Sequence, residues 1–365
     1  MSDLCAIIAV HHNREKAVAR AIDVHTHFVP EIMPSGTGRN ALWPSIEHRE
    51  RNTAAVIVGG KVFRAIDSRS WDAGRRLQDM QLDDVDVQVV SPMPELLSHW
   101  FPVGDADALS SHINCSIAKL CSAHPRSFVG IGMVPVQDPA LAARRLVDVK
   151  GLGLFGIEIG THIHGVALGD PRMHEFYAAA EEADLAIMIH PLHPSGMERI
   201  GGRPELAAVA AFPLETALAA TSLLTHGVTE RFPKLRILLS HGGGALPWIL
   251  PRLKYARALG PPLQDLFARD PDEMARTFYY DTILYDRLAL RFLADSVGAD
   301  HIVIGSDYPF SIKQDRPAQF AEQALGVSRE TFAANTARFL NQAPSTIWSA
   351  VTVEQQQENQ GETGG

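Results

Sequence analysis

The strongest constraint on the fold is an alternation of short apolar runs with longer amphipathic stretches along most of the 365-residue chain. Eight runs rich in Val and Ile have the length and composition of buried strands: Ala21–Val24, Val87–Val90, Phe128–Met133, Gly156–Ile159, Ala186–Ile189, Arg236–Leu239, Tyr279–Thr282 and Ile302–Ile304. Segments with apolar residues three and four apart favour helices between them: Leu109–Ala123, Ala140–Lys150, Met173–Ala183, Leu214–Leu224, Leu246–Leu259 and Arg287–Val297. This rhythm predicts an α/β fold of the TIM-like (β/α)8 barrel type, with a doubly wound sheet as the alternative.

One interval interrupts the rhythm. Residues 30–75, between the first two predicted strands, are too many for a simple loop, and "AAVIVGGKVFRAI" within them predicts a hairpin. We therefore expect one barrel domain over residues 21–345, with a small insertion over the barrel mouth at about 30–75. Residues 1–20 form an N-terminal extension, and the polar residues 346–365 predict a disordered tail.

Charge and cysteine content limit the classes of binding partner and the cellular compartment that we expect for this chain. The net charge of -9 includes no basic run, which argues against nucleic acid and favours a small anionic or neutral metabolite. Cys5, Cys115 and Cys121 form neither a paired nor a CxxC pattern, as expected in a reducing compartment. Because we find neither a signal sequence nor an uninterrupted apolar run of about 18 residues, we expect a cytoplasmic protein without a membrane segment.

Polar side chains gather where the predicted strands end. His25 and His27 end the first strand, and residues two apart on a strand point the same way. His190 ends the fifth strand, His241 the sixth and Asp307 the eighth. Because the carboxyl ends of barrel strands meet at one rim, we expect these groups to converge as a ligand set for a divalent metal. A pair of solvated or core histidines is the alternative for an isolated HxH.

The ligand types favour a catalytic metal over a structural one. Structural zinc is usually closed by four protein ligands that include cysteine, and no cysteine lies at a predicted strand end. Five candidate groups exceed the usual number, so one of them is expected to act on the substrate. His241, followed by three glycines, is the candidate acid/base residue, and a fifth ligand is its alternative role.

The motifs also resemble a known family. "DVHTH", "IHP", "SHGGG" and "GSDYPF", in this order, resemble the amidohydrolase superfamily and its decarboxylase branch, typified by 2-amino-3-carboxymuconate-6-semialdehyde decarboxylase. The similarity runs from about residue 22 to about residue 339. It implies a (β/α)8 barrel with one divalent metal ion, usually zinc, although manganese and cobalt suit the same ligands. Carried over by motif, the metal ligands are His25, His27, His190 and Asp307, and the acid/base residue is His241.

The resemblance also implies cations that hold a substrate carboxylate. Arg64 in "KVFR" matches a family arginine, with Lys61 close to it. Arg252 in "LPRL" matches an arginine that reaches into the neighbouring subunit's site, which implies a homodimer. A planar guanidinium suits the task because it can donate two parallel hydrogen bonds to a carboxylate.

One segment differs from the family pattern, and a second contains histidines that the pattern does not account for. Leu192 and His193 stand where the family has an aromatic and an acidic residue facing the ligand. His162 and His164 form a second HxH after the fourth strand, and we interpret them as pocket-lining or loop histidines.

These features predict a metal-dependent, non-oxidative decarboxylase of an unsaturated or aromatic carboxylic acid. The substrate would resemble 2-amino-3-carboxymuconate-6-semialdehyde or a hydroxybenzoate. The ligand set alone is equally suited to a metal-dependent hydrolase or hydratase, because metal-bound water serves all three reactions. A non-catalytic binding protein is expected to lack at least one of the metal-ligating residues, whereas all four of them are present in this sequence.

Overall fold

The computed structural model describes residues 21–342, so the predictions for residues 1–20 and 346–365 lie outside the described residues. Parallel strands form two sheets, ordered β1-β5-β6 and β13-β12-β11-β10-β7. Their bounds are β1 Ile22–Phe28, β5 Val87–Pro92, β6 Phe128–Gly130, β7 Gly156–Gly160, β10 Ala186–His190, β11 Ile237–Leu239, β12 Tyr279–Asp281 and β13 Ile302–Val303. They match the predicted strands, although β1 runs on to Phe28 and β6 is shorter than predicted.

Backbone hydrogen bonds close these two sheets into one barrel. On one side, the amide of Val24 donates to the carbonyl of Ile304 over 2.8 Å. On the other side, the amide of Glu158 donates to the carbonyl of Gly132, also over 2.8 Å. Because both junctions pair parallel backbone, the fold is the predicted (β/α)8 barrel and not the doubly wound sheet.

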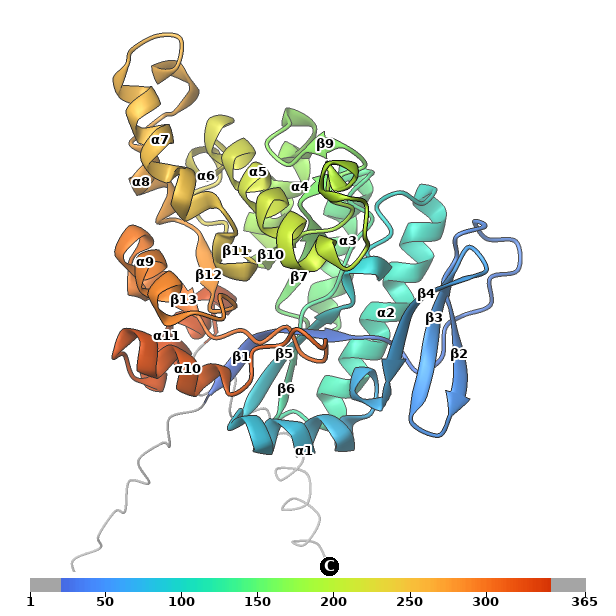
Figure 1. The fold of residues 1–365 in the computed structure, drawn as a ribbon. Helices are drawn as coiled ribbons and strands as arrows, with labels where there is room; N and C mark the ends of the chain where they lie inside the picture. The colour runs from blue at the N-terminus through green and yellow to red at the C-terminus, as the bar shows by residue number, and fades with distance from the viewer. Residues whose placement is uncertain (1–20, 343–365) are drawn as a thin grey trace, which may run out of the picture.

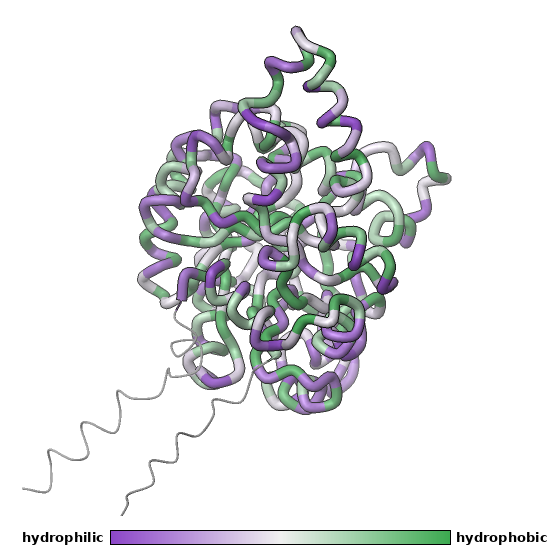
Figure 2. The backbone as a smooth tube through the Cα atoms, turned by 90° about the vertical axis from the view of Figure 1, so that its left-hand side faces the viewer, coloured by the Kyte–Doolittle hydropathy of each residue, from purple (hydrophilic) through white to green (hydrophobic). Residues whose placement is uncertain are grey.

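Helices surround the barrel (Figure 1). They are α1 Ala73–Asp83, α2 Val103–Ala123, α3 Pro139–Gly151, α4 His174–Ala183, α5 Phe212–Thr225, α6 Val228–Arg231, α7 Leu246–Ala258, α8 Pro271–Ala275, α9 Arg287–Val297, α10 Pro317–Leu325 and α11 Arg329–Leu340. Aspartates begin several of them, and Asp138 and Asp286 accept hydrogen bonds from amides of the first turns of α3 and α9. Hydrophobic segments cross the centre of the molecule in Figure 2, with more hydrophilic ones around them.

The interior of the barrel is apolar at one end and polar at the other. A hydrophobic cluster takes alternate residues from the first halves of the strands, such as Ile22 and Val24 of β1, and α11 contributes Phe339 and Leu340 to it. The pairing of β1 with β5 then shifts register between residues 23 and 26. A bulge at this point redirects the following side chains, so the strand that begins with apolar residues can end with histidines at the polar end.

The interval between β1 and α1 contains a separate antiparallel sheet, ordered β2-β3-β4. Its strands are β2 Ser45–Glu50, β3 Thr53–Val58 and β4 Lys61–Asp67. The predicted hairpin corresponds to β3 and β4, whereas β2 is mostly exposed and polar and gave no apolar pattern. The sheet lies near α2 in Figure 1. A further short pair, β8 His162–Ile163 and β9 Val166–Ala167, follows β7.

One segment of the described chain is long and apolar enough to cross a membrane, namely Ala207–Thr225, which includes α5. It contains Glu215, which is buried and accepts a hydrogen bond from the amide of Ser195 over 2.7 Å. Its buried residues pack in the barrel's outer layer, so we interpret the segment as a core helix.

Candidate metal centre

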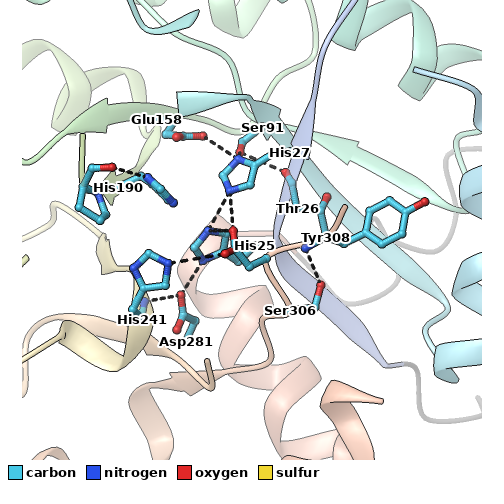
Figure 3. Close-up of polar contacts among 12 residues, drawn as sticks. His25, Thr26, His27, Ser91, Glu158, His190, His241, Asp281, Ser306 and Tyr308 are labelled. Carbon is cyan, nitrogen blue, oxygen red and sulfur yellow. Dashed lines mark hydrogen bonds and ion pairs between the residues drawn. The ribbon is translucent and has the colours of Figure 1, made fainter. Parts of the chain in front are cut away.

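The four predicted metal ligands lie together at the polar end of the barrel. Figure 3 labels the three histidines among them. His25 and His27 come from β1, His190 ends β10, and Asp307 lies four residues beyond β13. One ligand atom from each lies within 4.8 Å of the others, and all four residues are buried. Within residues 21–342, no other group of metal-ligating side chains converges in this way.

Hydrogen bonds fix the ring orientation of each histidine ligand. Nδ1 of His25 lies 2.7 Å from Oδ2 of Asp281, and Nδ1 of His27 lies 3.1 Å from a backbone carbonyl at the end of β5. Nδ1 of His190 lies 2.8 Å from the carbonyl of the residue that follows it. Because these three acceptors require an N–H at Nδ1, each neutral ring presents a lone pair at Nε2, as metal-binding histidines do.

The donor set fits a single divalent cation. Nε2 of His25 and Nε2 of His27 lie 3.0 Å apart, and two facing lone pairs repel each other unless positive charge lies between them. Nε2 of His190 is buried and has no hydrogen-bond partner among the described residues. Oδ1 of Asp307 lies 3.1 Å from Nε2 of His27 and supplies negative charge. Three imidazoles and one carboxylate are ligands that zinc and manganese accept.

Electrostatics keep these groups ready to bind a cation. Burial and the neighbouring histidines lower the pKa of His190 well below its ordinary value, so its ring stays neutral. Burial alone would raise the pKa of Asp307, but its close contact with the His27 ring and the other nearby imidazoles hold that pKa below its ordinary value. The carboxylate is therefore ionised at neutral pH.

His241 lies beside this cluster but outside it. Its Nε2 is 4.0 Å from Oδ2 of Asp307, and it does not belong to the group of four converging ligands. Burial lowers the pKa of His241, and its Nδ1 has no hydrogen-bond partner in the described chain. This geometry favours the acid/base role over that of a fifth ligand.

The turn that carries His241 is held in an uncommon conformation. His241 has a φ of 54°, a value that is rare for residues other than glycine, and its amide donates to Oδ2 of Asp281 over 2.9 Å. Gly244 has a φ of 59°, and a Cβ there would lie 2.0 Å from the carbonyl oxygen of Pro213. The third glycine thus allows close approach to α5.

A cavity of about 880 Å³ opens beside the cluster. Its wall includes His190, His241 and Asp307 together with Arg64 of β4. Aromatic rings line it further, among them Phe310, whose centroid is 5.0 Å from that of His27, and Phe212, which stacks on His241 at 6.4 Å. The cavity is therefore large enough for an aromatic acid and combines apolar walls with one guanidinium.

The structure separates the other predicted substrate-binding residues from this cavity. Lys61 is exposed at the turn that begins β4, three residues from Arg64, and it does not line the cavity. Arg252 is exposed on α7 and does not line the cavity of its own chain. The roles of both remain predictions.

The histidines of the second HxH line a different, smaller cavity of about 310 Å³. Leu192 and His193 lie there with His162 and His164, together with the buried His99. Leu192 and His193 are absent from the wall of the larger cavity, although the family pattern led us to expect them there.

Asp281, at the end of β12, was missed by the sequence reasoning. It is fully buried, and its two oxygens accept from His25 and from the amides of His241, Gly242 and Ile283. It therefore positions both a candidate ligand and the candidate acid/base residue. The available signal was its place at a strand end, within the "FYYDTILYD" segment.

The chain matches proteins of known family along most of its length. A model of the amidohydrolase family matches residues 22–341. A 2-amino-3-carboxymuconate-6-semialdehyde decarboxylase of Dictyostelium discoideum is 33% identical over 85% of this chain and 87% of its own.

Solved structures also share the fold. Metarhizium anisopliae IDCase, in apo form, superposes with a TM-score of 0.75 at 22% identity, covering 88% of this chain and 97% of its own. A 5-carboxyvanillate decarboxylase of Novosphingobium aromaticivorans, complexed with manganese and 4-hydroxy-3-methoxy-5-nitrobenzoic acid, has a TM-score of 0.64 at 26% identity. That match covers 77% of this chain and 81% of the relative.

Proposed function

Because this chain belongs to the amidohydrolase family and is a metal-dependent carboxy-lyase, we propose that it removes CO2 from an aromatic or unsaturated carboxylic acid without oxidation. The observation that carries the proposal is the convergence of His25, His27, His190 and Asp307 beside a cavity with aromatic walls and one guanidinium.

The four converging residues would hold one divalent metal ion. When bound, such an ion would supply positive charge that stabilises negative charge on the reacting substrate. The family resemblance implies zinc as the usual ion, while a related decarboxylase structure contains manganese, so we propose that either ion supports activity.

We assign the proton transfer to His241. Decarboxylation consumes one proton: the carbon that bears the carboxylate is protonated, the C–C bond breaks, its electron pair returns to the ring or chain, and CO2 leaves. His241 lines the cavity, and its lowered pKa keeps the imidazole neutral, so it can accept a proton from substrate or solvent and pass it on.

The substrate class follows from the wall of the cavity. Phe212 and Phe310 provide apolar surface for a ring, and Arg64 can bind a carboxylate with charge-assisted hydrogen bonds. Relatives act on 2-amino-3-carboxymuconate-6-semialdehyde, 6-methylsalicylic acid and gamma-resorcylate, as their names state. We therefore propose a hydroxybenzoate-like or carboxymuconate-like substrate.

We also propose that the chain acts as a cytoplasmic homodimer in which Arg252 completes the partner's site. In support, α7 packs against both α5 and α9. These helices carry large apolar side chains that are each more than half exposed: Leu214, Leu218, Trp248, Tyr255 and Leu288. Exposed apolar surface of this kind is typical of an interface, and Arg252 lies on α7 among it.

The proposal is tested with purified protein stripped of metal and reloaded with manganese or zinc. CO2 release is measured from carboxymuconate semialdehydes, 6-methylsalicylate and dihydroxybenzoates. We expect metal-dependent release from at least one of these compounds. Turnover without CO2 would instead indicate a hydrolase or hydratase on this scaffold.

A further inference from the structure

The turn after β12 carries a tyrosine that lines the large cavity and that the proposed function does not use. Tyr285 belongs to the "FYYDTILYD" segment and lies between β12 and α9. Its side chain forms part of the cavity wall and is half exposed, so a ligand in the cavity can reach it. Its hydroxyl has no hydrogen-bond partner among residues 21–342. The wall of the cavity therefore offers an accessible donor whose capacity is unused.

The backbone holds Tyr285 in a conformation that a bulky residue rarely adopts. Its φ is 58°, in the left-handed region that favours glycine and asparagine. Two hydrogen bonds shape the turn: the amide of Leu284 donates to the carbonyl of Thr282 over 2.8 Å, and the amide of Asp286 donates to the carbonyl of Leu284 over 2.7 Å. Asp286 in turn caps α9. A strained residue that its surroundings fix in a cavity wall is a candidate for a functional role.

The hydroxyl lies near the candidate metal centre and keeps its proton. Partial burial and the nearby carboxylates of Asp307 and Asp281 raise the pKa of Tyr285 above its ordinary value, so the phenol is a donor at neutral pH. Arg64 belongs to the insertion after β1, whereas Tyr285 follows β12, and β13 lies between these two strands in the barrel. The two donors therefore reach the cavity from different segments, where they can hold two separate points of one ligand.

A second hydroxyl lines the same cavity, that of Ser311. Ser311 is exposed and does not have a positive φ, so its place in the wall carries no comparable conformational cost. The strained backbone thus singles out Tyr285 as the hydroxyl that the fold holds in place.

We propose that Tyr285 is a substrate-binding residue that donates its phenolic hydrogen bond to an oxygen of the substrate other than those of the carboxylate at Arg64. The inference rests on the proposed function, in which Arg64 holds a carboxylate. The two donors fix the substrate at two points, and Phe212 and Phe310 provide apolar surface for its ring or chain. Such two-point binding orients the carbon that loses CO2 relative to His241.

The test measures binding and does not require turnover. Manganese-loaded wild type, Tyr285→Phe and Tyr285→Asn are titrated by calorimetry with 2-, 3- and 4-hydroxybenzoate and with the three methylbenzoates, in which a methyl group replaces the hydroxyl. Tyr279→Phe is the matched control, because Tyr279 belongs to the hydrophobic cluster at the apolar end of the barrel. Ser311→Ala tests the second hydroxyl of the wall.

In wild type we expect the hydroxyl compound to bind more tightly than its methyl counterpart at one or more ring positions. Tyr285→Phe should reduce this preference about two- to tenfold, as expected for the loss of one hydrogen bond. Tyr279→Phe and Ser311→Ala should keep it. Tyr285→Asn, whose side chain is too short to reach the same point, should lose the preference as well. It should nevertheless unfold at a denaturant concentration equal to or above that of wild type, because asparagine tolerates the left-handed conformation.

An unchanged preference in Tyr285→Phe at all three ring positions would overturn the inference, and so would a loss of preference in Ser311→Ala instead. Equal weakening of hydroxyl and methyl ligands in both Tyr285 variants, with a lower unfolding midpoint of Tyr285→Asn, would mean that Tyr285 merely shapes the turn. CO2 release by a protein whose Tyr285→Phe variant keeps the wild-type preferences rejects the inference alone. A reduced preference in a protein that releases no CO2 from any substrate rejects the proposed function and keeps the inference.

Discussion

Replacing Asp281 with asparagine should weaken metal binding although Asp281 is not a ligand. Its Oδ2 accepts from Nδ1 of His25 over 2.7 Å and from the His241 amide over 2.9 Å. Its Oδ1 accepts from the amides of Gly242 and Ile283 over 2.9 and 3.1 Å. Four donors therefore meet a group that only accepts, whereas asparagine replaces one oxygen with an NH2 donor.

Either orientation of the asparagine has a cost. If the NH2 replaces Oδ2, it faces Nδ1 of His25, which must then accept, and the proton moves to Nε2 where the metal ion should bind. If the NH2 replaces Oδ1, two buried backbone amides lose their acceptor at about 1–3 kcal/mol each. Loss of such an orienting partner typically reduces metal affinity about 10–100-fold, or about 1.4–2.7 kcal/mol.

The assay is a metal titration in competition with a chelator, together with chemical unfolding of the metal-free protein. We expect the metal dissociation constant to rise about 10–100-fold, or the free energy of unfolding to fall by about 2 kcal/mol or more. The control is Asp286→Asn at the N-cap of α9, where asparagine caps as well as aspartate. Wild-type metal affinity and wild-type stability in Asp281→Asn would refute the reasoning.

Three further perturbations test other parts of the site. His241→Gln should lower kcat about 10²–10⁴-fold with metal content unchanged, as measured by steady-state kinetics and elemental analysis; loss of metal would instead make His241 a ligand. If Arg252 completes the partner's site, mixing and reassembling inactive Arg252→Ala and His241→Gln subunits should restore part of the activity, and no recovery contradicts the shared site. Burial lowers the pKa of His99 from 6.5 to about 3, so the folded state resists its protonation. Metal-free wild type should therefore lose about 1.4 kcal/mol of stability per pH unit below 6.5 from this group, with full stability above it. His99→Gln should show a shallower loss between pH 7 and pH 5 in denaturant titrations, and an equal slope would contradict the assignment.

Periodicity sufficed to predict the barrel because its strands are buried on both faces and read as apolar runs. The same argument failed for β2, "SIEHRE", whose side chains are mostly exposed and polar. Strand ends also gave the candidate ligands, because the (β/α)8 architecture brings the ends of β1, β10 and β13 to one rim.

Other parts of the site depend on geometry that the sequence does not encode locally. The pair of Arg64 and Glu95 joins residues 31 positions apart, one on β4 and the other in the 3-10 turn Pro94–Leu96 that follows β5. Lys61 and Arg64 are close in sequence, yet only Arg64 lines the cavity. The position of Leu192 beside a second cavity depends on how the segment after β10 turns, which no periodicity predicts.

The most direct measurement of the central claim follows a carboxyl-labelled substrate. Metal-loaded protein is given an aromatic acid, such as 6-methylsalicylate, labelled with ¹³C at the carboxylate in D2O. The account predicts one ¹³CO2 for each product molecule and one deuteron on the carbon that lost the carboxylate. The metal-free protein should release no ¹³CO2 and should form no deuterated product. A product that retains the label while water adds to it would contradict decarboxylation.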